Sequence, residues 1–217
     1  YELVYDPQRS DGNHHKRFWN AVGSFGAYYP VKMYNILREN EDAFSSRDCE
    51  ALVPTLARLV YANRFCAGEK TILMLYNATG HTFAGEVLKL DLRPGEHVFD
   101  LLRSREAEWA PGKDGALARV FLLRDEVACL VRVPARLAVK RSSNWLEATV
   151  RDVVKGWQLR VCDAEGEPLL TRPAAEGPTK LNLAELAPKA RPAVCVKLLD
   201  GPRLVDVVAM PVEGAGK

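Results

Sequence analysis

The chain has 217 residues, 47% of them hydrophobic, which suits one large or two small globular domains. Its 30 Lys and Arg residues nearly balance its 28 Asp and Glu residues, so the net charge is only +2. This balance argues against nucleic acid or an anionic membrane as the main partner, because both favour a clustered basic field. The sequence also contains no apolar run of the ~18–20 residues that a membrane span needs and no signal-peptide pattern.

The first sixty residues are predicted to form a mainly helical segment, 1–60, which opens with a short strand over residues 1–6. From Lys16 onward, apolar residues recur at helical spacing, and a second helix is predicted to begin at Pro30. The apolar side of this segment is too large for the segment to cover by itself. We therefore expect an interface with the remainder of a longer polypeptide or with another chain, formed by Phe18, Trp19, Val22, Met33, Ile36 and Leu37. The start at Tyr1 rather than at Met agrees with a fragment of a longer protein.

Strand signals dominate after a short helical turn that is predicted over Cys49–Val53. Thr71–Tyr76 is continuously apolar, which is typical of a strand covered on both faces. Val120–Leu123 and Val127–Val133 are separated by three polar residues, and this spacing predicts a hairpin. Together with the alternating segments between them, these runs predict a β-sandwich over residues 61–134.

A second set of strands follows Pro134 and predicts an immunoglobulin-like β-sandwich over residues 135–213. Trp157, Leu159 and Val161 alternate with polar residues, whereas 172–180 is predicted to be an irregular loop. The predicted fold class is therefore mainly β: an N-terminal helical segment followed by two antiparallel β-sandwich domains.

Reactive groups are scattered along the sequence. The five cysteines form no Cys-x-x-Cys pair, so we expect no zinc site, and the strand-like surroundings of Cys129, Cys162 and Cys195 favour buried thiols over a disulfide. His14 and His15 are adjacent, which is poor spacing for a chelate on a helix. No metal or cofactor is predicted. None of the common hydrolase, phosphate-loop or dinucleotide motifs is present, and no catalytic residue is assigned.

Three further features leave alternatives open. Trp109 and Trp145 lie in predicted loop margins, where an indole could stack on a sugar ring, although packing over a sheet edge is the more common role. Asn77-Ala-Thr79 matches the glycosylation acceptor pattern but also a simple turn. Asp6 and Asp11 follow the first predicted strand and are interpreted as solvated loop residues rather than glycosidase carboxylates.

Four segments together resemble one family of proteins; they are Lys32–Phe44, Leu52–Thr55, Val60–Phe65 and Lys70–Gly80. They resemble the last helix of a (β/α)8-barrel glycoside-hydrolase-like protein and the C-terminal β-sandwich that follows it. The resemblance covers Lys16–Glu106, and Leu75–Gly80 is its most distinctive part. It implies a sandwich that packs beside a barrel and carries no catalytic residues. The barrel strands that would hold the acid and the nucleophile are not part of this sequence.

The sequence therefore predicts the non-catalytic C-terminal portion of a glycoside hydrolase that acts in carbohydrate metabolism. The alternative is an immunoglobulin-like module that binds carbohydrate or protein and has no enzymatic parent. Carbohydrate remains a possible partner under both hypotheses, whereas nucleic acid and membrane are not expected partners.

Overall fold

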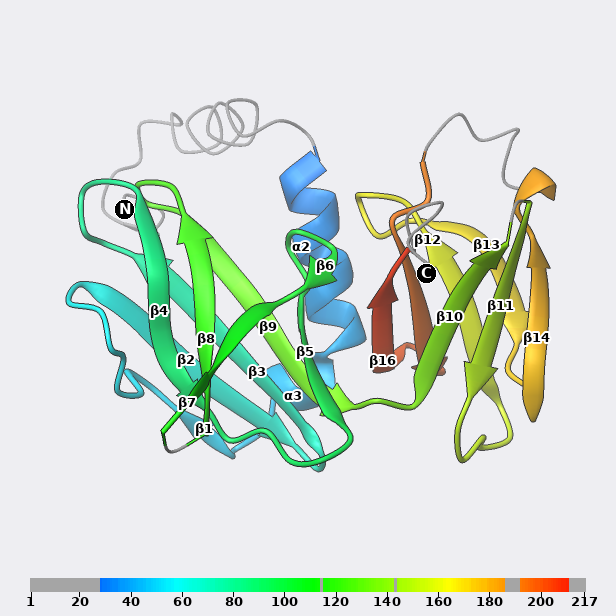
Figure 1. Cartoon of the computed structure of the whole chain (residues 1–217), viewed down its shortest axis with the longest axis horizontal. Helices are drawn as coiled ribbons and strands as arrows, with labels where there is room; N and C mark the ends of the chain where they lie inside the picture. The colour runs from blue at the N-terminus through cyan, green and yellow to red at the C-terminus, as the bar shows by residue number, and fades with distance from the viewer. Residues whose placement is uncertain (1–27, 114, 143, 186–191, 211–217) are drawn as a thin grey trace, which may run out of the picture.

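The computed structural model describes residues 28–113, 115–142, 144–185 and 192–210. In this part of the chain, helices α2 (Tyr28–Glu39) and α3 (Glu41–Phe44) precede a series of antiparallel strands. The strands form two β-sandwiches that lie next to each other, and α2 lies between them (Figure 1). The predicted fold class, mainly β with an N-terminal helical part and two sandwiches, is confirmed.

The first sandwich packs a larger sheet, with the order β1-β2-β3-β9-β5-β6, against a smaller sheet, β4-β8-β7. Its strands are β1 (Cys49–Glu50), β2 (Val60–Ala67), β3 (Lys70–Asn77), β4 (Phe83–Leu90), β5 (Glu96–Asp100), β6 (Arg105–Glu106), β7 (Glu108–Gly112), β8 (Gly115–Leu122) and β9 (Val127–Pro134). Leu75, Val87, Leu122 and Leu130 are among the buried residues between the two sheets. This core belongs to the first sandwich alone.

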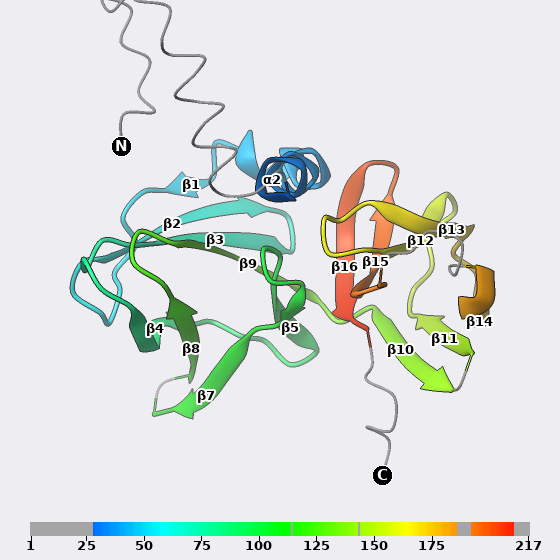
Figure 2. The ribbon, with the colours of Figure 1, turned by 90° about the horizontal axis from the view of Figure 1, so that it is seen from above.

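Strand β3 is buried on both faces, as its continuous apolar sequence predicts. Leu73 and Leu75 point into the core of the first sandwich. Ile72 points the opposite way and packs in the cluster that contains Ile36 and Ala43 of the helices. Figure 2 shows this arrangement, with α2 lying above the larger sheet.

The predicted hairpin over Val120–Val133 is wrong. Strand β8 pairs with β4 and β7, whereas β9 pairs with β3 and β5, so the short connection crosses from one sheet to the other. The buried Asn77 side chain holds this crossing, because its Nδ2 donates hydrogen bonds to the carbonyl oxygens of Leu122 (3.2 Å) and Leu123 (2.9 Å). Asn77 is therefore a structural residue that is buried in the fold, although it begins a glycosylation acceptor pattern.

The second sandwich packs the sheet β10-β11-β14 against the sheet β13-β12-β15-β16. Its strands are β10 (Leu137–Ser142), β11 (Trp145–Val150), β12 (Trp157–Cys162), β13 (Pro168–Pro173), β14 (Gly177–Asn182), β15 (Cys195–Asp200) and β16 (Arg203–Ala209). The first, second and fifth strands face the third, sixth and seventh, which is the immunoglobulin-like arrangement. Here the fourth strand, β13, pairs with β12. The chain passes from one sandwich to the other between Pro134 and Leu137.

Two local predictions are corrected. The segment 172–180, predicted to be an irregular loop, contains the end of β13 and part of β14. Its Pro and Ala residues weaken the strand signal, and both strands lie at sheet edges, where proline is tolerated. The turn predicted as helical at Cys49–Val53 begins with strand β1, in which Cys49 lies opposite Phe65.

Candidate functional site

Helix α2 lies in a third apolar cluster, between the two sandwiches. We call this cluster the interdomain core; its buried residues are Ile36, Ala43, Ile72, Phe99, Leu101, Leu102, Cys129, Val131, Val133, Cys162, Cys195, Leu199, Leu204 and Val207. They come from both helices, from the outer face of the larger sheet of the first sandwich, and from the sheet of the second sandwich that contains β12, β15 and β16. The helices therefore fill the junction between the two sandwiches.

The predicted interface residues separate into distinct groups. Ile36 is only 4% exposed and belongs to the interdomain core, so the expectation that it contacts another chain is corrected. Met33 is partly buried against the same core. Leu37 is 43% exposed. The other three predicted interface residues, Phe18, Trp19 and Val22, lie outside the described residues.

The side of α2 that faces away from the interdomain core also carries large apolar residues. Val31, Tyr34 and Leu37 recur at a spacing of three, which places them along one side of the helix. Their exposed fractions are 40%, 63% and 43%. We call these three residues the outer stripe. Helix α2 is thus apolar on two sides. Within the part of the chain that the structure describes, one side is covered by the interdomain core and the outer stripe is exposed.

A buried ion pair fixes α2 to the second sandwich. The Nζ atom of Lys197 on β15 lies 2.6 Å from Oε2 of Glu39, and both side chains are almost fully buried. Burial alone would lower the pKa of Lys197, but the Glu39 carboxylate outweighs it and the pKa is raised. Lys197 is therefore charged at neutral pH. The guanidinium of Arg160 on β12 adds a second, longer contact to Glu39 at 3.9 Å.

Further polar contacts connect the helices to both sandwiches. Lys32 donates a hydrogen bond to Ser104 of the first sandwich (2.9 Å), and Asn35 donates one to the carboxylate of Glu167 in the second (2.9 Å). Lys70 on β3 contacts Asp42 of α3 at 2.7 Å and donates to the carbonyl oxygen of Leu204 on β16 (3.2 Å). These bonds fix the relative orientation of the two sandwiches, because the apolar contact alone is not directional.

His97 forms a charged bridge across the same junction. Its Nε2 lies 2.7 Å from Oδ1 of Asp206 on β16, and its Nδ1 lies 3.1 Å from Oε2 of Glu106 on β6. The second oxygen of Asp206 accepts hydrogen bonds from the backbone N–H groups of Arg136 (2.7 Å) and Leu137 (2.6 Å), where the chain enters the second sandwich. Burial would lower the pKa of His97, but the bonds to Asp206 and Glu106 raise it to about 10.

This bridge predicts a pH-dependent stability. Because the folded pKa of His97 is about 10 and an unfolded histidine has a pKa of about 6.5, the contribution is complete below about pH 6.5 and is lost as the pH rises toward 10. We expect His97→Gln to lower the free energy of unfolding by about 2 kcal/mol at pH 6 and by clearly less at pH 9. Urea unfolding of both proteins across this range measures the difference; a constant difference would contradict a charged His97.

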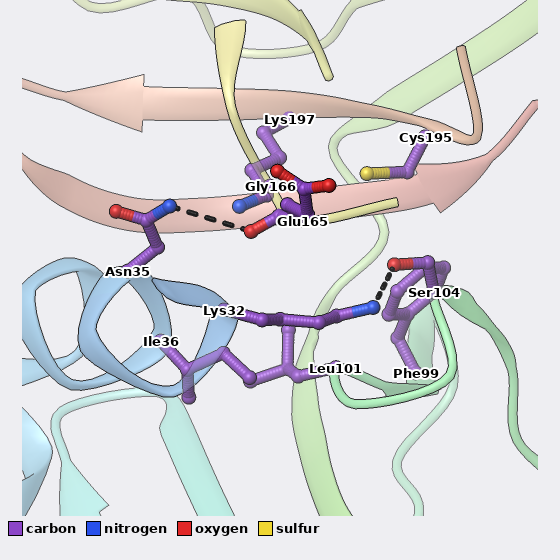
Figure 3. Close-up of a pocket in the computed structure, with 10 residues that line it drawn as sticks. All are labelled: Lys32, Asn35, Ile36, Phe99, Leu101, Ser104, Glu165, Gly166, Cys195 and Lys197. Carbon is purple, nitrogen blue, oxygen red and sulfur yellow. Dashed lines mark hydrogen bonds between the residues drawn. The ribbon is translucent and has the colours of Figure 1, made fainter. Parts of the chain in front are cut away.

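A small pocket lies where α2 meets both sandwiches (Figure 3). Lys32, Ser104, Glu165 and Cys195 are among the residues that line it, and its volume is about 10 Å³. A space of this size holds about one water molecule. Since drug-sized ligands occupy cavities of several hundred Å³, this pocket cannot take a sugar or a nucleotide.

The two candidate sugar-binding tryptophans are both exposed but do not form one site. Trp109 lies on β7 of the first sandwich and is 53% exposed. Trp145 begins β11 of the second sandwich and is 47% exposed. The strands that carry them lie at distant places in Figure 1, because each belongs to a three-stranded sheet of a different sandwich. Any binding by these indoles would involve two separate surfaces.

The buried carboxylates of the described residues all have structural partners. Besides Glu39 and Asp206, Asp100 pairs with Arg103 at 2.9 Å, and Asp163 accepts hydrogen bonds from backbone N–H groups of the turn that follows β12. No group of three His, Cys, Asp or Glu side chains in the described ranges could hold a metal ion. Asp6 and Asp11, the other carboxylates considered in the sequence, lie outside these ranges.

The ionic contacts at the junction were not among the features predicted from the sequence. One signal was present: Lys197 lies in an apolar run between Val196 and Leu198, and such a run predicts a strand buried on both faces. A lysine in such a strand requires a buried acidic partner. That partner, Glu39, lies 158 positions away from Lys197 in the chain. The sequence around Glu39 carries no comparable sign that its side chain is buried.

No protein-family model matches this chain, and a search of curated protein sequences found no match. Among the described residues, no helix is long and apolar enough to cross a membrane.

Proposed function

We propose that this chain is the non-catalytic C-terminal portion of a glycoside-hydrolase-like protein of carbohydrate metabolism, and that it packs against a (β/α)8 catalytic barrel. The observation that carries this proposal is the outer stripe of α2. Val31, Tyr34 and Leu37 are exposed on a helix whose other side is already anchored in the interdomain core. A helix that is apolar on two sides is typical of one that lies between two packed layers.

The resemblance in sequence supports the same assignment. The segment Lys32–Phe44 resembles the last helix of a barrel, and in the structure it contains most of α2 and all of α3. A helix in that position contacts the barrel on one side and the following sandwich on the other. We assign the interdomain core to the sandwich side and the outer stripe to the barrel side.

A second exposed apolar region lies on the same sandwich. The loop between β1 and β2 exposes Leu52, Leu56 and Leu59, which are 67%, 53% and 43% exposed. Leu52 and Leu59 have φ angles of +56° and +61°, in the left-handed region that non-glycine residues seldom adopt. Residues in rare backbone conformations cluster at functional sites, and contiguous exposed apolar residues mark interaction surfaces, so this loop is a candidate for a second contact with the barrel.

The buried carboxylates take part in bonds that hold the fold together, which is consistent with a non-catalytic role for this chain. Glu39, Asp100, Asp163 and Asp206 each bond to cations or to backbone N–H groups that hold the fold together. A glycosidase needs a pair of carboxyl groups that flank a substrate cleft. In the proposal, the barrel supplies that pair.

The test begins with the coding sequence upstream of Tyr1, which the proposal requires to encode alternating strand and helix units. In the full-length protein, we expect Leu37→Asp to increase hydrogen exchange in α2 and in the barrel helices that face it. Val154→Asp is the matched control, because Val154 is 51% exposed but lies in the second sandwich. An upstream sequence without such units, or equal exchange in both variants, would contradict the proposal.

The second candidate function is carbohydrate binding without an enzymatic parent, and the half-exposed indoles of Trp109 and Trp145 favour it. Aromatic rings that are open to solvent can stack on the apolar face of a sugar. Retention of a glycan by this chain, lost in Trp145→Ala, would support this function over the first.

A further inference from the structure

Two cysteines lie directly opposite each other on neighbouring strands of the second sandwich. Cys162 ends β12 and Cys195 begins β15, and they are paired residues in the antiparallel register of these strands. Paired residues of antiparallel strands have Cα atoms about 4.5–5.5 Å apart, which is within the range that a disulfide spans. Both residues are present as free thiols. The backbone therefore holds the two side chains at a separation suited to a disulfide.

The surroundings of the pair distinguish the two sulfur atoms. Hydrogen bonding to the Cys162 thiol lowers the pKa of Cys195, burial opposes this effect, and Lys197 and Lys32 lower the pKa further. The pKa of Cys162 is raised by the same hydrogen bond and by burial. The thiolate is the reactive form, so the lowered pKa makes Cys195 the better nucleophile of the two. The Cys162 thiol donates a hydrogen bond to the carbonyl oxygen of Arg160 at 3.9 Å.

Only Cys195 lines the water-sized pocket at the junction. Figure 3 shows its sulfur atom facing the space beside the hydrogen bond between Lys32 and Ser104. A space of about 10 Å³ holds about one water molecule, so hydrogen peroxide, which has two oxygen atoms, is among the few oxidants that a small outward movement of the pocket walls would admit. Larger oxidants, such as oxidised glutathione, do not fit this space.

We propose that Cys162 and Cys195 form a peroxide-oxidised, reversible disulfide at the junction of the two sandwiches. Nothing in this inference depends on the proposed packing against a barrel. The Cys195 thiolate attacks one oxygen of hydrogen peroxide; a sulfur–oxygen bond forms, the oxygen–oxygen bond breaks, and hydroxide leaves and takes up a proton to become water. The Cys162 sulfur then attacks the sulfenic sulfur; the disulfide forms, and the oxygen leaves as a second water with the Cys162 proton. Two thiols lose two electrons, and one peroxide gains them.

The other cysteines serve as internal comparisons. Cys49 is exposed and lies opposite Phe65, and Cys66 lies opposite Thr71, so neither has a cysteine as its cross-strand partner. Cys129 is buried in the interdomain core and lies opposite Met74. If exposure alone decided reactivity, hydrogen peroxide would oxidise Cys49 first. The cross-strand geometry predicts instead that Cys162 and Cys195 are oxidised together, to one disulfide.

The experiment uses the complete chain with Cys49→Ser and Cys66→Ser, which leaves the proposed pair and Cys129. The folded protein is treated with hydrogen peroxide, alkylated under denaturing conditions and analysed by intact mass and peptide mapping. We expect the loss of two alkylated thiols, a peptide link between Cys162 and Cys195, and full recovery of both thiols when the denatured protein is treated with dithiothreitol. In the same background, Cys162→Ala is expected to leave a sulfenic acid on Cys195 that reacts with dimedone.

Three results would overturn the inference. The first is a disulfide that involves Cys129 rather than the proposed pair. The second is a peptide map in which Cys162 and Cys195 remain reduced at peroxide concentrations that oxidise Cys49 in the unmodified chain. The third is equal labelling of Cys195 and Cys129 by dimedone in Cys162→Ala, since both are buried and only Cys195 faces the pocket. Circular dichroism checks that each variant is folded.

Discussion

Replacing Ile36 by aspartate is expected to lower the free energy of unfolding of the chain by about 4 kcal/mol. The substitution removes a buried aliphatic side chain, worth about 2–5 kcal/mol when truncated, and places a carboxyl group in an apolar cluster without a partner. Ile36 is 4% exposed and contacts residues of the interdomain core. Urea unfolding followed by tryptophan fluorescence measures the loss, because Trp157 is buried in the core of the second sandwich.

The adjacent residue supplies a matched control. Leu37 is 43% exposed on the outer stripe, so Leu37→Asp is expected to change the free energy of unfolding of this chain by less than about 0.5 kcal/mol. The two variants have the same new side chain at neighbouring positions of one helix, and they differ in the direction that the side chain faces. Equal effects would show that α2 is not oriented as described here.

Replacing Lys197 by methionine is expected to cost about 3 kcal/mol. Methionine retains much of the apolar length of lysine, but the Glu39 carboxylate then remains buried without its partner at 2.6 Å. Removing one member of a buried ion pair typically costs about 3–5 kcal/mol, and the contact of Arg160 with Glu39 at 3.9 Å offsets part of this cost. Chemical unfolding of the variant at neutral pH provides the measurement.

A double variant distinguishes two causes of the loss of stability: the unpaired buried charge and the lost packing of the side chain. Glu39→Leu together with Lys197→Met replaces both ions with apolar groups of similar size, and such replacements are often neutral or stabilising. We therefore expect the double variant to be more stable than Lys197→Met alone. A double variant that is less stable than either single variant would mean that the pair contributes mainly through packing.

Local sequence patterns were sufficient to predict the class of fold and several of its strands. The apolar run Thr71–Tyr76 and the alternation from Trp157 to Val161 each correspond to an observed strand, β3 and β12. Periodicity reports how many faces of a strand are buried, and this property survives into the folded protein. It does not report which strand is the neighbour, and for that reason the crossing between β8 and β9 was predicted as a hairpin.

The junction between the sandwiches could not be predicted in the same way. The amphipathic pattern of α2 shows that Ile36 requires cover, but the pattern is equally compatible with cover from another chain and from strands far along the same chain. The ion pair of Glu39 with Lys197 and the bridge of His97 to Asp206 join positions 158 and 109 residues apart. Contacts of this kind depend on the packing of two complete sandwiches, which no local window of sequence contains.

The position of β16 has a consequence for synthesis on the ribosome. Strand β16 follows every other described strand in the chain, yet it supplies Asp206 to His97 and to the backbone that connects the sandwiches, and Leu204 to Lys70. The first sandwich leaves the exit tunnel of the ribosome before β16 has been translated. The part of the interdomain core that lies on the helices and the first sandwich therefore stays without its cover from β16 until that strand has been made, and a nascent chain that stalls before β16 exposes these residues to chaperones.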